Sequence, residues 1–219
     1  AITACPIGSL QFFWGQLHII PFYVLGVTIL AALALGRGWC GWVCPFGLVQ
    51  DLLARIRGNR IIRHIPAWAG AIKYVMLFGV AGFGAWYLGE PVFCKLCPAG
   101  SLEAGIPQVL LDERLQQQIG PFYFAKLGLL AAILLASVYV SRFFCQVICP
   151  LGALFSLFNK LSLFQIKLND GACKSCGVCA KRFCPVGLKA ETEANNNACI
   201  KCGECQKCPT EAVTTGIDF

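Results

Sequence analysis

Long apolar stretches alternate with short polar ones along the first three quarters of the chain. Three of them reach the roughly 20 apolar residues that a helix needs to cross a bilayer, at residues 12–35, 65–88 and 122–140. The second and third each contain one lysine, Lys73 and Lys126, and we expect both to lie near helix ends, where the long side chain reaches the membrane surface. The pattern predicts a mainly α-helical membrane protein with about three transmembrane helices.

The composition changes near residue 163. Only 13% of the 219 residues are charged and 57% are hydrophobic, whereas a soluble domain has about 25% charged residues. Residues 164–219 are more polar and contain eight of the 15 cysteines. We therefore expect two domains, 1–163 in the membrane and 164–219 docked directly on it. The net charge of +7 does not indicate a nucleic-acid partner, because the basic residues flank apolar stretches and form no stripe with aromatic residues.

Charge differs between the polar segments that separate the apolar stretches. Residues 36–66 contain five Arg and one Asp, residues 89–121 contain two basic and four acidic residues, and nine Lys or Arg follow Ser141. Because loops rich in Lys and Arg stay on the cytoplasmic side, we expect residues 36–66 and the C-terminal part there. Residues 89–121 and the N-terminal residues would face outward. No signal peptide is expected in this chain, since no basic region precedes the first apolar stretch.

The motif Cys-Pro-x-Gly occurs four times, and its copies begin at Cys5, Cys44, Cys97 and Cys149. Three copies have a second cysteine three or four residues upstream, at Cys40, Cys94 and Cys145. Arg37 and Arg142 each stand three residues before the first cysteine of a pair. Two thiolates at this spacing can point at one metal centre, the proline keeps the preceding cysteine out of a helix, and the glycine allows close backbone approach. Packing of cysteine as a small apolar residue is the alternative, which four repeats of one motif disfavour.

The four copies predict one or two [4Fe–4S] clusters in the membrane domain. One predicted crossing separates each copy from the next, which is an inverted-repeat pattern. The copies predicted on the cytoplasmic side supply four thiolates, Cys40, Cys44, Cys145 and Cys149. The copies predicted on the outer side supply three, Cys5, Cys94 and Cys97, and their fourth ligand would be a non-cysteine side chain, a partner's group or a residue before Ala1. His18 is a candidate for that ligand or for a quinone contact, although backbone or water often satisfies such a histidine.

The eight cysteines of the C-terminal part form two runs, C-x2-C-x2-C-x4-C-P from Cys173 and C-x2-C-x2-C-x2-C-P from Cys199. The bacterial two-cluster run is C-x2-C-x2-C-x3-C-P, and its fourth cysteine serves the other cluster. Each run here departs by one residue from the standard final spacing. Two [4Fe–4S] clusters are predicted, with a zinc ribbon as the alternative. The predicted ligand sets are Cys173, Cys176, Cys179 and Cys208 for one cluster, and Cys199, Cys202, Cys205 and Cys184 for the other.

These motifs resemble those of polyferredoxin-like membrane iron–sulfur proteins of the NapH/MauN type. Residues 38–45 and 145–150 carry the resemblance in the membrane part, and residues 173–209 carry it in the soluble part. The resemblance implies a small α+β, two-cluster bacterial ferredoxin-like domain on the cytoplasmic side of a multi-pass protein. The implied location is the cytoplasmic (inner) membrane of a prokaryote, with lipid around the helices. The resemblance also implies electron transfer between quinol and other redox proteins.

The sequence contains no motif for group-transfer chemistry. We expect an electron-transfer subunit of a respiratory oxidoreductase complex, which relays electrons between a quinol or extracytoplasmic redox partner and the cytoplasm-side clusters. Arg37, Arg142 and Lys95 are expected to raise cluster potentials. A quinone oxidoreductase subunit with its own site near His18, and a cluster-bearing assembly or regulatory protein, are alternatives. Cysteine motifs on both predicted sides suggest that electrons cross the membrane through this chain.

Overall fold

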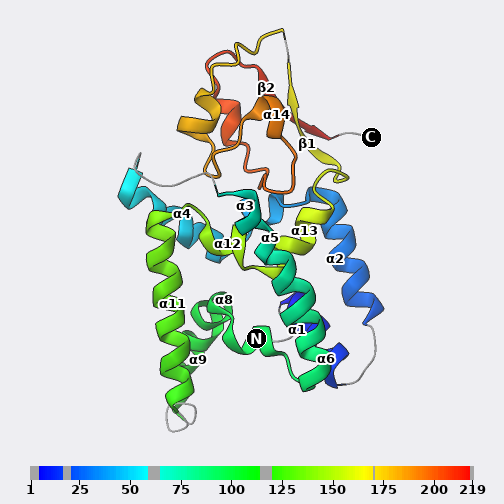
Figure 1. The fold of residues 1–219 in the computed structure, drawn as a ribbon, viewed down its shortest axis with the longest axis vertical. Coiled ribbons are helices and arrows are strands. Elements are labelled where there is room, and N and C mark those ends of the chain that lie inside the picture. The colour runs from blue at the N-terminus through cyan, green and yellow to red at the C-terminus, as the bar shows by residue number, and fades with distance from the viewer. Residues whose placement is uncertain (1–4, 17–20, 59–64, 114–119, 170, 218–219) are drawn as a thin grey trace.

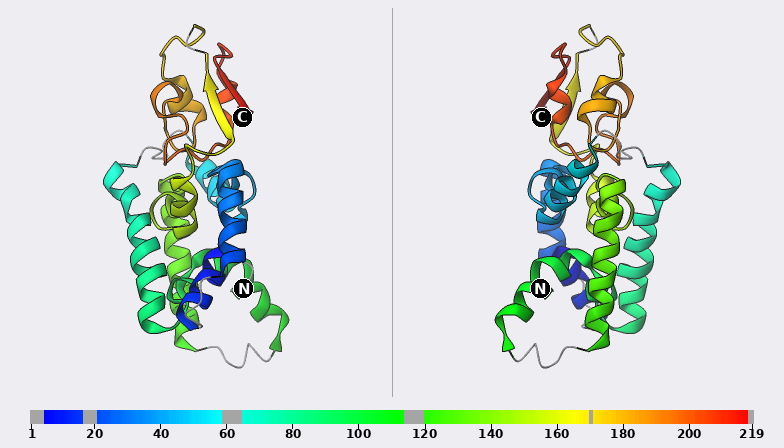
Figure 2. Two further views of the ribbon diagram at one scale, coloured as in Figure 1. Left: turned by 90° about the vertical axis from the view of Figure 1, so that its right-hand side faces the viewer. Right: turned by 90° about the vertical axis from the view of Figure 1, so that its left-hand side faces the viewer.

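A bundle of helices carries a small domain with two strands at one end (Figure 1). The computed structural model describes residues 5–16, 21–58, 65–113, 120–169 and 171–217. The side views in Figure 2 show the C-terminal part standing on the end of the bundle, so that the long axis of the molecule runs through both.

Among the described residues, two helices are long and apolar enough to cross a membrane, by length and composition. The first is the continuous run Trp68–Leu88, made of α5 (Ala67–Val75), the π-helical η2 (Met76–Gly84) and α6 (Ala85–Leu88). The second is α11 (Pro121–Tyr139). They coincide with two of the three apolar stretches.

The first apolar stretch, 12–35, is not one helix. It is divided between α1 (Pro6–Gln16) and α2 (Phe22–Leu35), and α2 has only 14 residues. Pro21 stands at the N-cap of α2 with φ −77°, and its ring nitrogen has no hydrogen to continue a helix from the preceding turn. The expectation of about three transmembrane helices is therefore not met by the described residues, which contain two candidates. His18 lies outside the described residues.

Residues 89–121, expected as an outward-facing loop, fold back against the bundle where they are described. They form α7 (Val92–Leu96), α8 (Pro98–Gly100), the π-helical η3 (Ser101–Gly105) and α9 (Ile106–Leu111). Phe93 is buried in the same hydrophobic core as Ile7, Phe46 and Leu130. Figure 1 shows α8 beside α11, well inside the length of that helix. This segment is apolar enough to pack inward, although its net charge is negative.

Four helices at the other end of the bundle hold two of the three cysteine pairs, Cys40 with Cys44 and Cys145 with Cys149. They are α3 (Gly38–Trp42), α4 (Pro45–Arg57), α12 (Phe143–Val147) and α13 (Pro150–Leu157). All four lie at the end that carries the C-terminal domain (Figure 1). The segments richest in arginine and lysine therefore gather at one end of the molecule, as the loop charges predicted.

The C-terminal part is built on an antiparallel pair of strands, β1 (Phe164–Leu168) and β2 (Val213–Ile217). Phe164 pairs with Ile217, and Leu168 pairs with Val213. Between the strands lie the π-helical η4 (Cys179–Phe183), α14 (Ala190–Glu193) and the 3-10 helix η5 (Glu204–Lys207). A small core of buried residues joins these elements, namely Ile166, Val186, Leu188, Ala190, Cys199, Ile200 and Val213.

Polar contacts fasten this part directly onto the helices, as expected for a second domain docked on the first. The Lys201 side chain is fully buried and donates to the Asn159 carbonyl at 2.8 Å, and also to the Ser162 hydroxyl and the Phe164 carbonyl. The Asn159 amide donates to the carbonyls of Asn196, at 2.6 Å, and Cys199, at 2.9 Å. The cysteine loop of the small domain is thus held by the residues that follow α13.

Candidate metal centres

In three of the Cys-Pro-x-Gly copies the cysteine stands at the N-cap of a new helix. Cys44, Cys97 and Cys149 have φ between −68° and −63° and ψ between 112° and 119°, and a helix starts at the proline that follows each. The proline imposes this extended geometry on the residue before it. The prediction that these cysteines stay out of helical conformation is confirmed. Their thiols therefore lie at helix N-termini, where backbone N–H groups favour negative charge.

Two of the three cysteine pairs, Cys40 with Cys44 and Cys145 with Cys149, have nearly the same local structure, and each is called a half-site below. Gly47 lies so close to the Cys40 carbonyl that an added Cβ would be 3.0 Å from its oxygen, and Gly152 lies in the same relation to Cys145, at 2.9 Å. The third copy differs, because a Cβ on Gly100 would meet nothing closer than 3.9 Å. The glycine thus allows the helix after the second cysteine to pack on the backbone of the first.

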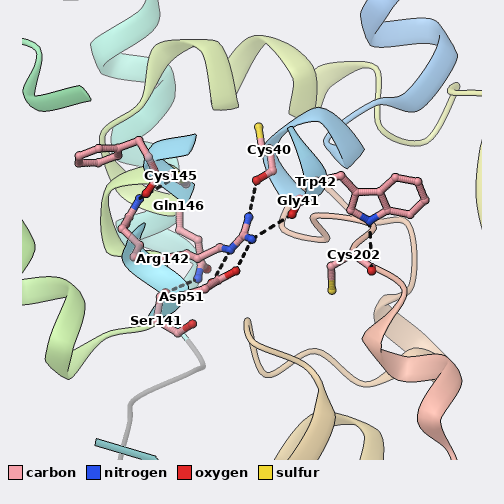
Figure 3. A network of polar contacts seen from close by, with 11 residues as sticks. Cys40, Gly41, Trp42, Asp51, Ser141, Arg142, Cys145, Gln146 and Cys202 are labelled. Carbon is pink, nitrogen blue, oxygen red and sulfur yellow. Dashed lines mark hydrogen bonds and ion pairs between the residues drawn. The ribbon is translucent and has the colours of Figure 1, made fainter. Parts of the chain in front are cut away.

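The two arginines cross between the half-sites. Arg37 donates through Nη2 to the Cys145 carbonyl at 2.9 Å. Figure 3 shows the opposite contact, in which Arg142 donates through Nη1 to the Cys40 carbonyl. Each arginine stands three residues before the first cysteine of its own half-site and binds the other half-site. Both side chains are almost fully buried. This exchange brings together two segments whose arginines, Arg37 and Arg142, are 105 positions apart in the sequence.

The partners of the two arginines differ. Arg142 is ion-paired with Asp51, with Nε 2.7 Å from Oδ1 and Nη2 close to Oδ2. Arg37 instead donates through Nη1 to the carbonyls of Asn197 and Ala198, at 2.9 and 3.0 Å. Its Nε is buried and has no hydrogen-bond acceptor among the described residues. The half-sites are therefore alike in backbone and unlike in charge.

One cavity of about 480 Å³ lies between the half-sites, and its walls include the four cysteines Cys40, Cys44, Cys145 and Cys149. Cys5 and Cys97 line the same cavity, and Cys94 interacts electrostatically with both of them. The expectation that these three cysteines lie on the opposite face from the four is corrected here. Because residues 89–111 fold back into the bundle and α1 packs beside them, Cys5 and Cys97 pack against the same apolar core as Cys44, Cys145 and Cys149.

Burial and neighbouring thiols raise the pKa of several cysteines in and around this core. All 15 cysteines of the chain are free, so no disulfide joins them. Burial, and then the neighbouring Cys40 and Cys44, raises the pKa of the Cys145 thiol to about 12. Burial, Cys5 and Cys97 raise the pKa of Cys94 to about 12 as well. A thiolate at these positions needs a strong positive partner, which a bound metal provides.

The donor set and its surroundings fit an anionic cluster bound by four thiolates. Gln50 donates from its amide nitrogen to the Cys145 sulfur at 3.1 Å, and the Gly152 N–H faces the Cys149 sulfur at 3.4 Å. Arg37 and Lys73 are 0% and 3% exposed, and neither forms an ion pair with a carboxylate in the part of the chain that the structure describes. Buried cations need a counter-charge. A cluster bound by the four thiolates would supply it.

The cysteines of the C-terminal part divide between two places. Cys173, Cys176, Cys179 and Cys208 line one cavity of about 220 Å³. Cys205 interacts electrostatically with Cys202, Cys199 and Cys184, and burial together with these three raises its pKa to about 12. The described residues contain no group of three or more Cys, His, Asp or Glu side chains close enough for a single metal ion. The last cysteine of each run thus lies with the first three cysteines of the other run.

The irregular spacings of the two runs are absorbed by the backbone. Between Cys179 and Cys184 the chain forms a π-helical turn, in which the Cys184 N–H binds the Cys179 carbonyl five residues back at 2.7 Å. Between Cys205 and Cys208 it forms a 3-10 turn, in which the Cys208 N–H binds three residues back at 3.2 Å. A π turn is wider and a 3-10 turn tighter than an α turn. The extra and missing residues therefore leave both Cys-Pro units at the end of a closed turn.

A direct contact links the membrane cysteines to the C-terminal ones. The Trp42 indole N–H donates to the Cys202 carbonyl at 3.1 Å, and Arg142 donates to the Gly41 carbonyl at 3.2 Å (Figure 3). A Cβ on Gly41 would lie 2.6 Å from the Ile200 carbonyl oxygen. The segment between Cys40 and Cys44 therefore packs on the loop that holds Cys199 and Cys202.

Sequence reasoning missed several residues of these sites. Gln50, Asp51 and Lys73 all take part, and Lys73 is buried with its ammonium 3.2 Å from the Asn197 carbonyl. The expectation that Lys73 reaches the membrane surface is therefore wrong. Lys95, expected to tune a potential, is exposed and paired with Glu90. The one sequence feature that could have indicated a role for Gln50 and Asp51 is their position shortly after the second Cys-Pro-x-Gly copy.

Comparison with known proteins finds one family. The profile of a 4Fe-4S binding domain family matches residues 17–63, 73–108 and 123–169. Each matched segment contains one of the paired-cysteine motifs. No solved structure matches the chain.

Several curated proteins are similar to it. An uncharacterised protein of Methanocaldococcus jannaschii is 30% identical over 173 residues, which are 75% of this chain and 65% of that protein. The methylamine utilization ferredoxin-type protein MauN of Methylobacillus flagellatus is 26% identical over 231 aligned residues, covering 97% of this chain and 75% of that protein. The regulatory protein NosR of Pseudomonas aeruginosa is 28% identical over 170 residues, 73% of this chain and 22% of that protein. The chain spans between about half and two thirds of the length of several such relatives.

Proposed function

Because the chain belongs to the 4Fe-4S binding domain family of NapH/MauN-type iron–sulfur proteins, we propose that it is an integral membrane electron-transfer subunit. It relays electrons between a redox partner at the membrane and the clusters of its C-terminal part. The bound clusters supply one-electron storage. The protein supplies position, burial and hydrogen bonds that set their potentials.

The observation that carries this proposal is the uninterrupted succession of cysteine sets. Cys5 and Cys97 share a cavity with Cys40, Cys44, Cys145 and Cys149. The segment after Cys40 touches the loop of Cys202. Cys184 lies with the cysteines of that loop, and Cys208 lies with the remaining run. A chain of neighbouring centres suits electron relay and has no use in a protein that only packs cysteine in its core.

The proposed ligand sets follow this succession. One cluster is held by Cys40, Cys44, Cys145 and Cys149, and two more by Cys173, Cys176, Cys179 and Cys208 and by Cys199, Cys202, Cys205 and Cys184. Cys5, Cys94 and Cys97 hold a fourth centre together with one further ligand. Domains 1–163 and 164–219 divide these centres, and the second stands on the cytoplasmic side of a prokaryotic inner membrane.

Electron transfer through the fourth centre is tested by removing it. Protein reconstituted in liposomes is reduced by a membrane-soluble donor, and the absorbance of the clusters reports how fast electrons reach the C-terminal part. We expect Cys94→Ser with Cys97→Ser to lose iron and to slow this reduction, while a soluble reductant added directly still reduces the C-terminal clusters. Unchanged iron content and an unchanged rate of reduction would contradict the proposal for this centre.

Two other functions make different predictions. A quinone oxidoreductase subunit would show cluster reduction by quinol in the isolated chain. A regulatory or assembly protein, which the name of the relative NosR brings into consideration, would associate transiently with its target. Stoichiometric co-purification with an oxidoreductase supports the electron-transfer subunit against the latter.

A further inference from the structure

Two buried cations of the membrane part meet at one carbonyl group of the C-terminal part. Lys73 donates from Nζ to the Asn197 carbonyl at 3.2 Å, and Arg37 donates from Nη1 to the same oxygen at 2.9 Å. Lys73 comes from α5, in the first candidate membrane span, and Arg37 directly precedes α3. Two positive charges on one acceptor repel each other, so the pair needs an anion nearby.

The anion that faces this pair is the thiolate set of the half-sites. Lys73 interacts electrostatically with Arg37, Cys40 and Cys149, which belong to different half-sites. The Arg37 Nη2 binds the Cys145 carbonyl at 2.9 Å. Lys73 and Arg37 therefore lie beside both halves of the proposed four-cysteine centre.

The other arginine does not contribute in the same way. Arg142 is neutralised by Asp51 through two contacts, so the net charge that it adds beside the centre is small. Arg37 and Lys73 have no such carboxylate among the described residues. The positive field at the centre thus comes from one side, which is the side that faces the loop of Asn197.

We propose that Lys73 is a positioning residue that sets the reduction potential of the centre held by Cys40, Cys44, Cys145 and Cys149. This inference rests on the proposed function. A cluster that gains an electron gains negative charge, so a buried ammonium group beside it favours the reduced form. Because Lys73 also binds the loop before Cys199, the same side chain ties this centre to the nearest cysteines of the C-terminal part.

The test is a redox titration followed by electron paramagnetic resonance on the purified protein. The signal of this centre is first identified as the one that Cys145→Ser removes. In Lys73→Gln, which keeps an N–H donor and loses the charge, we expect the reduced-to-oxidised ratio at a given potential to fall about tenfold. That corresponds to a midpoint potential about 59 mV lower. Lys73→Arg, which restores the charge, should titrate close to wild type.

Lys126→Gln is the matched control. Lys126 lies in the other candidate span with its ammonium 4.8 Å from the centre of the Phe122 ring, and its removal should leave the potential unchanged. Equal potentials in Lys73→Gln and wild type, or an equal fall in Lys73→Gln and Lys73→Arg, would overturn the inference. If Lys73→Gln retains no iron at this centre, Lys73→Met and Lys73→Arg are compared. If only Lys73→Arg retains iron, the centre needs the positive charge, which supports the inference. If all three variants lose iron, the centre needs the packing of the lysine side chain, which overturns the inference.

The two proposals fail separately. A wild-type protein without the signal that Cys145→Ser removes contradicts the proposed function at this centre. A wild-type signal whose potential ignores Lys73 contradicts only the present inference.

Discussion

At the scale of single residues, Gly47 and Gly152 each make a tight contact that a residue with a Cβ does not allow. A Cβ on Gly47 or Gly152 would lie 3.0 or 2.9 Å from a carbonyl oxygen of the first cysteine. Gly47→Ala and Gly152→Ala must therefore push a helix away from the half-site, at about 1–3 kcal/mol. We expect both variants to melt at lower temperature and to retain less iron.

Gly128→Ala provides the control for these variants. Gly128 lies in α11, and nothing lies within 4 Å of an added Cβ. Alanine also has the higher helix propensity, so this variant should keep its iron and its melting temperature. Identical behaviour of all three variants would show that the glycine contacts have no part in forming the centre.

Local rules predicted the cysteines well and failed for Lys73. The extended backbone of Cys44, Cys97 and Cys149 follows from the next residue alone. The burial of Lys73 depends on Asn197, a partner 124 positions away in the chain. A lysine in an apolar helix therefore has two outcomes, the membrane surface or a buried acceptor, and sequence pattern does not distinguish them.

At the scale of elements, the C-terminal runs show how a ligand pattern tolerates irregular spacing. The π turn before Cys184 and the 3-10 turn before Cys208 replace one α turn each. The repeated spacing of the two runs predicted that the eight cysteines are cluster ligands and that they are grouped crosswise. The turn types that close each run depend on hydrogen bonds within the folded loop.

Cys208→Ser tests the crossed grouping. Cys208 lines the cavity of Cys173, Cys176 and Cys179, so its replacement should alter the resonance spectrum or iron content of that cluster. Cys184→Ser is the matched variant and should alter the cluster of Cys199, Cys202 and Cys205 instead. A change confined to the run in which each serine stands would refute the crossed assignment.

Apolar length alone misjudged two elements. Residues 12–35 have the length of a span, yet Pro21 starts a new helix there. Loop charge predicted that residues 89–121 face outward, yet Phe93 packs in the core. Hydropathy reports which residues avoid water, and does not report whether lipid or protein covers them.

At the scale of the whole molecule, a few polar side chains hold the two parts together. Lys201 is fully buried and donates to three oxygens of the segment after α13. Lys201→Met leaves these acceptors without a charged donor, which costs about 1.5–3 kcal/mol. We expect faster proteolytic release of the C-terminal part and slower electron transfer between the two parts.

Lys207→Met serves as the comparison. Lys207 is exposed and pairs with Glu204 on the same 3-10 helix, and such surface pairs contribute about 1 kcal/mol or less. Release rates should then match wild type. Equal release rates in Lys201→Met and Lys207→Met would mean that Lys201 does not hold the interface.

The central claim is that two half-sites, one around Cys40 and one around Cys145, share a single cluster. The most direct test is the iron content of purified Cys40→Ser, Cys145→Ser and the double variant. The account predicts that each single variant loses about four iron atoms per chain, and that the double variant loses no more. Losses that add in the double variant, or iron content equal to wild type in all three, would contradict it.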